Sequence, residues 1–147
     1  MFDFKDNETA AKALFRLMLD HGKLPKVWGF SKVGRYRTEF PVNGGRIDLL
    51  LFHSDGGISI VETKGHGAPR EIAGGIGQLH VYAVLLPQAM RRMPAPKYVN
   101  LVLAAAVAHE DPERALTIAK ACESAHVRFL NLPTVKQMRD VIKQAAL

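Results

Sequence analysis

Two apolar segments on either side of a glycine-rich turn constrain the fold of this chain more than any other feature. The first is Ile-Asp-Leu-Leu-Leu-Phe at residues 47–52, and the second begins Ile-Ser-Ile-Val at residues 58–61. Ser-Asp-Gly-Gly at residues 54–57 separates them. Two short apolar runs around such a turn favour an antiparallel β-hairpin. We therefore expect two apolar, adjacent strands in the middle of the sequence.

The register of this hairpin brings acidic residues together. A simple ladder around a turn near Asp55 pairs Leu50 with Ile60, and it places Asp48 opposite Glu62. Because side chains alternate along a strand, both carboxylates and Lys64 share one face. Directly opposed residues have Cβ atoms about 4.5–5.5 Å apart. The sequence therefore predicts two carboxylates and an ammonium group that converge at the end of an apolar strand pair.

This combination of charges suits metal-assisted phosphodiester hydrolysis. Two adjacent carboxylates repel each other unless a cation lies between them. A site with few oxygen ligands suits Mg²⁺ or Mn²⁺, which keeps several waters and binds phosphate oxygens. The metal can activate a water, and Lys64 can orient that water or neutralise developing charge. A simpler interpretation makes Glu62 and Lys64 a solvated pair, but Asp48 within an apolar strand is costly to bury without a partner or a metal.

The remaining segments alternate between helix and strand patterns. Helices are expected from a cap at residue 6 or 7 to about residue 21, from within residues 65–77 to about residue 86, and over residues 112–123 and 134–146. Strands are expected over residues 35–42, 98–107 and 127–132, and prolines at 87, 94 and 96 are expected to break the chain after the second helix. This order predicts an α/β fold with a mixed central sheet flanked by helices, in one domain over residues 1–147.

Charge and composition narrow the class of partner. Lys and Arg outnumber Asp and Glu by 20 to 14, which favours a polyanionic partner, nucleic acid before an acidic membrane. The charge alone is equally consistent with a basic protein that has no polyanionic partner.

The single cysteine, Cys122, excludes an internal disulfide and a thiolate metal cage. The first ten residues lack the pattern of a secretory signal, and no apolar run reaches the ~18–20 residues of a membrane span. We expect a cytoplasmic protein without a membrane partner.

Asp48, thirteen intervening residues and Glu62-Thr63-Lys64 resemble the signature of the PD-(D/E)XK nuclease superfamily. Gln78 and Tyr82 on the following helix resemble the Gln-plus-Tyr motif of its RecB-like members, and Glu8 lies where many members carry a further acid. The sequence departs from the pattern at Ile47, where a proline often precedes the aspartate. The resemblance covers about residues 8–107. It implies a restriction-endonuclease-like αβββαβ core with a C-terminal αβα extension.

The same resemblance implies roles for individual residues. Asp48 and Glu62 would bind Mg²⁺ or Mn²⁺, with help from the carbonyl of Thr63 and from Glu8 through water. Glu39 on the neighbouring strand is a rival for Glu8, and an ordinary surface role for it is preferred. Lys64 would be the catalytic lysine, and Gln78 and Tyr82 would support the site or contact DNA. The implied activity is that of a metal-dependent DNA endonuclease, with a homodimer favoured if both strands are cut. Junctions, single strands and duplex ends all stay open as substrates, and both RecB-like and Holliday-junction-resolvase-like members fit.

Several basic residues are candidate contacts to nucleic acid. Arg35 and Arg37 share a strand face, Arg70 lies beside the glycine-rich segment, and His66 follows the Glu-Thr-Lys motif directly. For any one of them a solvated surface role is the simpler interpretation. The spacing of the histidines does not match a zinc motif. Two other classes remain as alternatives: a non-catalytic nucleic-acid-binding or assembly module, and a small-molecule enzyme, for which the phosphate-binding fingerprint is missing.

Overall fold

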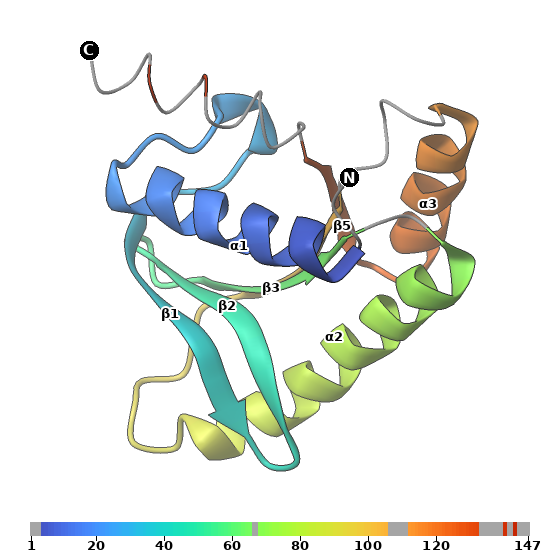
Figure 1. Ribbon diagram of the computed structural model, residues 1–147. Coiled ribbons are helices and arrows are strands. Elements are labelled where there is room, and N and C mark those ends of the chain that lie inside the picture. The colour runs from blue at the N-terminus through green and yellow to red at the C-terminus, as the bar shows by residue number, and fades with distance from the viewer. Residues whose placement is uncertain (1–3, 66–67, 106–111, 133–139, 141–142, 144–147) are drawn as a thin grey trace.

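A computed structural model describes residues 4–65, 68–105, 112–132, 140 and 143 of the protein and shows a mixed α/β fold (Figure 1). Its helices and strands alternate in the order expected from the sequence. The elements are α1 (Phe4–Asp20), a short 3₁₀ helix η1 (Lys26–Trp28), β1 (Val33–Val42), β2 (Gly45–His53), β3 (Ile58–Lys64), α2 (Pro69–Ala89), β4 (Val99–Ala105), α3 (Pro112–Ser124) and β5 (Arg128–Asn131). The expected helix over residues 134–146 lies outside the described residues, apart from positions 140 and 143.

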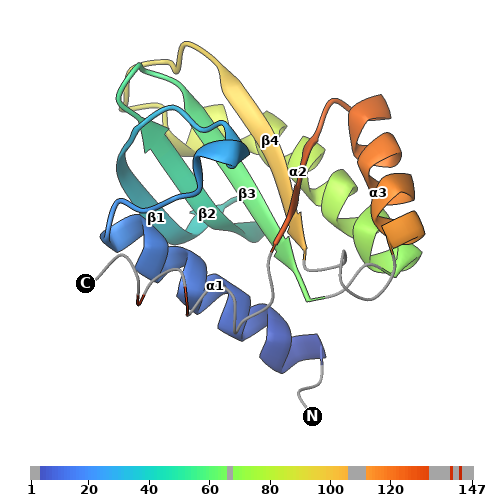
Figure 2. The ribbon, with the colours of Figure 1, turned by 90° about the horizontal axis from the view of Figure 1, so that it is seen from above.

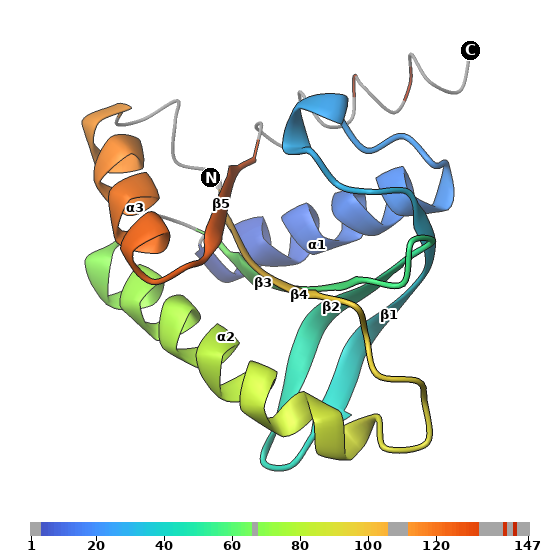
Figure 3. The same ribbon diagram turned by 180° about the vertical axis from the view of Figure 1, so that it is seen from behind.

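Within the described residues, five strands form one mixed sheet in the order β1-β2-β3-β4-β5. Strand β2 runs antiparallel to both of its neighbours, β1 and β3, whereas β3, β4 and β5 are parallel. The parallel connections pass through α2 and α3, because parallel neighbours need a crossover. Figures 2 and 3 show α1 on one face of the sheet and α2 on the other, with α3 beside α2 near β5. The expectation of a mixed sheet with helices on both faces is confirmed.

The central hairpin has the predicted register. Leu50 pairs with Ile60 and Phe52 with Ile58 across β2 and β3. Leu50 and Ile60 pack toward α2, whereas their neighbours Leu49 and Val61 pack toward α1. Both faces of these two strands are covered, which explains why they are almost continuously apolar instead of alternating between polar and apolar residues.

Helix α1 lies on the sheet through one apolar stripe. Ala11, Phe15 and Met18 follow the helical repeat and are buried. The Phe15 ring stacks on the Trp28 ring, with 5.3 Å between the centroids, so η1 closes the end of this core. The packing of α1 on the sheet brings the polar side chains of its first turns close to the ends of β2 and β3 where Asp48 and Glu62 lie.

Helix α2 is longer than predicted. The sequence predicts an interruption at Pro87, but the helix continues to Ala89. Proline removes one N–H and crowds the carbonyl four residues earlier, a cost that is smallest near a helix end. Here Pro87 lies in the last turn, where the N–H of Met90 donates to the Leu86 carbonyl at 2.9 Å. Leu86 and Met90 are both buried, and their packing offsets the lost hydrogen bond.

None of the helices in the described part of the chain combines the length and apolar character that a membrane span requires. Trp28 and Cys122 both lie in the core, where the aromatic ring and the small thiol fill apolar space.

Candidate functional site

The candidate site begins where the ladder between β2 and β3 ends. The last paired residues of this ladder are Leu49 and Val61. One step further along each strand lie Asp48 and Glu62, both buried. The main-chain N–H of Thr63 donates to Asp48 Oδ2 at 2.9 Å, and the Thr63 hydroxyl donates to the same oxygen at 3.0 Å. A carboxylate of β2 thus satisfies a main-chain donor of β3 at the point where the strands separate.

The second oxygen of Asp48 binds a lysine that the sequence analysis did not identify. Lys12 Nζ on α1 lies 2.9 Å from Asp48 Oδ1. The same nitrogen lies 3.6 Å from Glu39 Oε1 on β1 and 3.8 Å from Glu8 Oε1 on α1. Three acidic side chains from three elements therefore surround one ammonium group. Both rival acids of the sequence analysis, Glu8 and Glu39, belong to this group.

Glu39 occupies an irregular position in β1. Its neighbours Thr38 and Phe40 pair with Leu49 and Ile47, but Glu39 itself has a positive φ of 49°. That conformation is uncommon for a residue with a Cβ atom. The irregularity lies opposite Asp48, so the backbone of β1 departs from the regular ladder where the acidic side chains gather.

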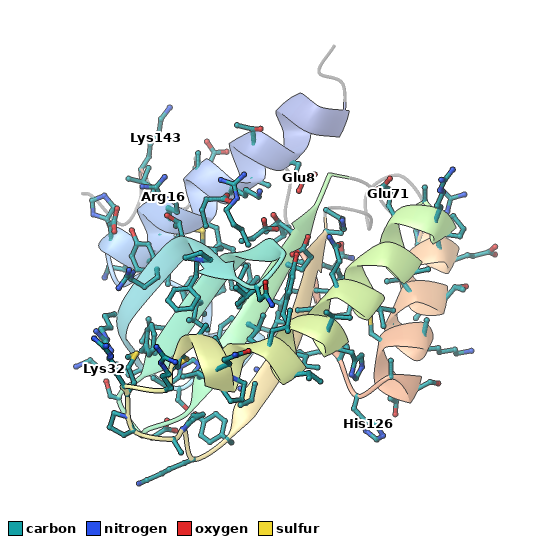
Figure 4. All side chains as sticks on the ribbon, turned by 90° about the horizontal axis from the view of Figure 1, so that it is seen from below. Glu8, Arg16, Lys32, Glu71, His126 and Lys143 are labelled. Atoms are coloured by element: carbon teal, nitrogen blue, oxygen red, sulfur yellow. The ribbon has the colours of Figure 1, made fainter. Side chains whose placement is uncertain are left out.

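Glu62 and Lys64 lie on the other side of the group and approach α2. Lys64 Nζ donates to Gln78 Oε1 at 3.1 Å and lies 3.6 Å from Glu62 Oε1. Glu71 Oε2, in the first turn of α2, is 4.0 Å from the same nitrogen. Figure 4 shows Glu8 and Glu71 on the two helices at either side of the end of β3. Lys64 is thus held by three oxygen atoms from two elements.

A glycine makes room for the stem of this lysine. A Cβ atom at Gly75 would lie 3.1 Å from Lys64 Cε and 2.7 Å from Leu103 Cδ1. The second distance is shorter than real contacts of a Cβ atom, so any other residue here would force the buried Leu103 side chain or α2 to shift. Close packing of α2 is what places Gln78 within reach of Lys64.

Burial and neighbouring acids give Glu62 an unusual pKa. Burial is the largest cause, the charge of Asp48 is the next, and together they raise the pKa of Glu62 to about 8 against opposing effects of Lys64 and Lys12. The pKa of Glu8 is also raised, because the effect of burial exceeds the opposing effect of Lys12. The pKa of Glu62 therefore depends on both lysines and on Asp48. Glu62 connects the charged side chains near α1 with those near α2.

Tyr82 lies close to this group on α2. Its ring is half-buried against Gly45, where an added Cβ would lie 3.3 Å from Tyr82 Cε1. Burial and the charges of Glu62 and Asp48 raise the pKa of the Tyr82 hydroxyl, whereas a hydrogen bond with Gln78 lowers it. Gln78 and Tyr82 are one helical turn apart, so α2 presents both toward the carboxylates.

The predicted nucleic-acid contacts are more dispersed. Arg35 and Arg37 are exposed on β1 and stack over apolar rings, with the Arg35 guanidinium 4.3 Å above Phe52 and the Arg37 guanidinium 5.7 Å above Phe40. Arg70 is exposed in the first turn of α2. His66 lies outside the described residues. Arg35 and Arg37 therefore form a basic surface on β1, and Arg70 adds a basic side chain at the start of α2.

Lys12 had one signal in the sequence. It follows Glu8 by four residues, the spacing of neighbours on one side of a helix, and it directly follows the buried Ala11. That position predicts that Lys12 lies at the border between the apolar stripe of the helix and solvent. Its contact with Asp48 depends on how α1 packs on the sheet, which the helical pattern alone does not specify.

The acidic group has the chemistry of a small cation site. Among the described residues, no three His, Cys, Asp or Glu side chains are arranged to hold a metal ion. Asp48 and Glu62 nevertheless supply carboxylate oxygens beside the main chain of Thr63, and an ammonium already lies against Asp48. Mg²⁺ needs only one or two protein carboxylates because it keeps several waters. The donor set therefore fits a hydrated divalent ion.

Comparisons with known proteins assign neither a family nor a fold to this chain. No protein-family model matches it, and neither a curated protein nor a solved structure does. The contacts, burial and charges of the described residues are therefore the basis for a functional assignment.

Proposed function

We propose that this protein is a metal-dependent DNA endonuclease that hydrolyses phosphodiester bonds with Mg²⁺ or Mn²⁺, on a restriction-endonuclease-like core of the PD-(D/E)XK type. One observation carries the proposal: the buried carboxylates of Asp48 and Glu62 lie close enough to interact electrostatically, and Glu62 lies 3.6 Å from Lys64, which Gln78 holds in place. The raised pKa of Glu62 supports it, since a buried acid that retains its proton near neutral pH is stabilised as an anion when a cation approaches.

Asp48, Glu62 and the carbonyl of Thr63 would hold the ion. When bound, the ion would supply an activated water and stabilise charge on the scissile phosphate. Asp48 is already oriented by two hydrogen bonds from Thr63, so its carboxylate loses little freedom on binding. Glu8 and Glu39 lie further out, where they would act through water.

Lys64 would perform the charge-neutralising part of the reaction. Its side chain is 12% exposed, and its stem packs beside Gly75. Gln78 accepts a hydrogen bond from the lysine ammonium at 3.1 Å, whereas the oxygens of Glu62 and Glu71 lie further away, at 3.6 and 4.0 Å, so the ammonium can still donate to a phosphate oxygen or a water. A donor fixed before the reaction stabilises developing charge without reorganisation.

The substrate proposal rests on charge. The formal charge of +6 favours a polyanion, and the exposed Arg35, Arg37 and Arg70 are available for phosphate contacts. Tyr82, and His66 outside the described residues, remain predicted contacts to DNA. A homodimer, a cytoplasmic location and a preference among junctions, single strands and duplex ends stay predictions as well.

Cleavage of supercoiled plasmid tests this function. Nicking is expected with Mg²⁺ or Mn²⁺ and should disappear in EDTA. Lys64→Ala should slow it roughly 100-fold or more, the usual effect of removing one donor to a transition state. Lys23→Ala, which removes an exposed lysine outside the site, is the matched control and should cut at the wild-type rate. Cleavage by Lys64→Ala or Asp48→Asn at the wild-type rate would refute the assignment.

A non-catalytic nucleic-acid-binding or assembly module is the second candidate, and the Lys12–Asp48 contact favours it. An ammonium at 2.9 Å partly neutralises Asp48 without any metal. Such a module would bind DNA in a gel-shift assay with and without EDTA and would leave plasmid intact at every Mg²⁺ and Mn²⁺ concentration. The two candidates therefore separate in one pair of assays.

A further inference from the structure

The Lys12 ammonium lies at Asp48, where the proposed metal ion would also bind. Its ammonium lies between Asp48, Glu39 and Glu8, at 2.9, 3.6 and 3.8 Å. In the described part of the chain, every ion-pair partner of this nitrogen is a carboxylate. A metal ion bound to Asp48 and a lysine in contact with the same carboxylate repel each other, so the two cations compete.

We propose that Lys12 is a built-in cation that neutralises Asp48 until a divalent metal displaces it, so that Lys12 sets the metal concentration at which the site fills. This inference rests on the metal site of the proposed function. It assigns a positioning role to a residue of α1 that lies outside the carboxylate-and-lysine motif.

The two lysines of the site differ in how firmly they are held. Lys64 is 12% exposed; it lies near the carboxylates of Glu62 and Glu71, but its shortest contact is a hydrogen bond to the neutral amide oxygen of Gln78. Lys12 is 27% exposed and is held by charge, with a flexible four-carbon stem. A metal ion removes the electrostatic reason for Lys12 to stay at Asp48, whereas the contact of Lys64 with Gln78 remains. Lys12 is therefore the lysine that a bound metal ion displaces from Asp48.

The departing ammonium has a place to go. Glu8 and Glu39 already lie within 4 Å of it, and both are more exposed than Asp48. A change of side-chain rotamer can move the ammonium toward these acids while α1 stays anchored by the buried Ala11 and Phe15. Exchange of Lys12 for a metal thus requires no movement of the helix.

Mn²⁺ binding to the full chain tests the proposal. The free ion is measured by electron paramagnetic resonance during titration of wild type, Lys12→Met, Lys12→Arg and, as the matched control, Lys23→Met. Removing one positive charge about 4 Å from the ion should tighten Mn²⁺ binding at least about tenfold in Lys12→Met. Lys12→Arg keeps the charge and should bind Mn²⁺ no more tightly than wild type. Lys23→Met should match wild type within about twofold.

Thermal unfolding in EDTA separates competition from a purely structural role. Lys12→Met should unfold at a lower temperature than wild type without metal and should gain more from added Mn²⁺. Lower stability together with an unchanged or weaker Mn²⁺ affinity would overturn the proposal and leave Lys12 as a structural contact. If Lys12→Met does not fold, tighter Mn²⁺ binding by Lys12→Arg than by wild type is the contradicting result.

Failure of this inference differs from failure of the proposed function. Mn²⁺-dependent nicking by wild type with equal Mn²⁺ affinity in Lys12→Met would refute the role of Lys12 alone. Tighter binding in Lys12→Met without nicking by any variant would refute the nuclease and keep the competition. No Mn²⁺ binding by wild type or Lys12→Met would refute both.

Discussion

Substitution of Glu62 by glutamine should change how the stability of the metal-free protein depends on pH. The pKa of Glu62 is raised from 4.5 to about 8, chiefly by burial and then by Asp48. Between these values the folded state binds more protons than the unfolded state, so the free energy of unfolding falls as pH rises. The contribution is complete below about pH 4.5 and is lost as pH rises through about 8.

The size of this effect follows from the two pKa values. At 1.36 kcal/mol per pKa unit, the difference between 4.5 and about 8 corresponds to at most about 5 kcal/mol. Glutamine keeps the shape and carries no charge at any pH. Wild type and Glu62→Gln should therefore have similar stability near pH 5, and Glu62→Gln should be more stable by several kcal/mol near pH 9, a large part of the stability of a small domain.

Urea unfolding in EDTA at pH 5 to 9 measures this difference. Comparison of the two proteins cancels the titration of the groups that do not interact with Glu62. Glu123→Gln, on the exposed surface of α3, is the matched control and should parallel wild type. A difference between wild type and Glu62→Gln that stays constant from pH 5 to 9 would refute the idea that Glu62 is buried against Asp48.

Three further predictions concern the support of the site and the packing of the core. Gly75→Ala should lower the free energy of unfolding by about 1–3 kcal/mol in urea unfolding, because its Cβ would lie 2.7 Å from Leu103. Gly74→Ala, at a neighbouring helical position with open space, should instead be neutral or stabilising by up to about 1 kcal/mol, and equal effects would contradict this packing. Gln78→Ala should slow plasmid nicking about tenfold or more without weakening DNA binding in a gel shift, since Lys64 loses its fixed acceptor, and unchanged nicking would show that Lys64 does not need it. Burial raises the pKa of Cys122 to about 11, so iodoacetamide should label it only after unfolding, and rapid labelling of folded protein at pH 8 would refute its burial.

The central hairpin was predictable because its determinants are local. Apolar runs, a glycine-rich turn and alternation of side chains are all properties of adjacent residues. They predicted the pairing of Leu50 with Ile60 and of Phe52 with Ile58, which the structure has. The same local rules brought Glu62 and Lys64 together, since residues two apart on a strand share a face.

The rules failed where packing overrides local preference. Pro87 predicts a break, yet α2 continues because Leu86 and Met90 are buried beside it. The ladder of β2 and β3 ends at Leu49 and Val61, so the surroundings of Asp48 could not be read from register alone. Asp48 accepts its hydrogen bonds from Thr63, and it forms an ion pair with Lys12 on a helix far away in the sequence.

The sequence by itself determined the order of strands and helices, the buried hairpin and the presence of two acids and a lysine near one strand end. Only the tertiary structure decided which cations and acids surround Asp48. Lys12, Glu39 and Asp48 lie on three elements, and their distances depend on how α1 packs across the sheet through Ala11 and Phe15. A helical pattern indicates which side of α1 is buried, but the position of α1 along the strands is a property of the whole core, because it depends on contacts between residues that are distant in the chain.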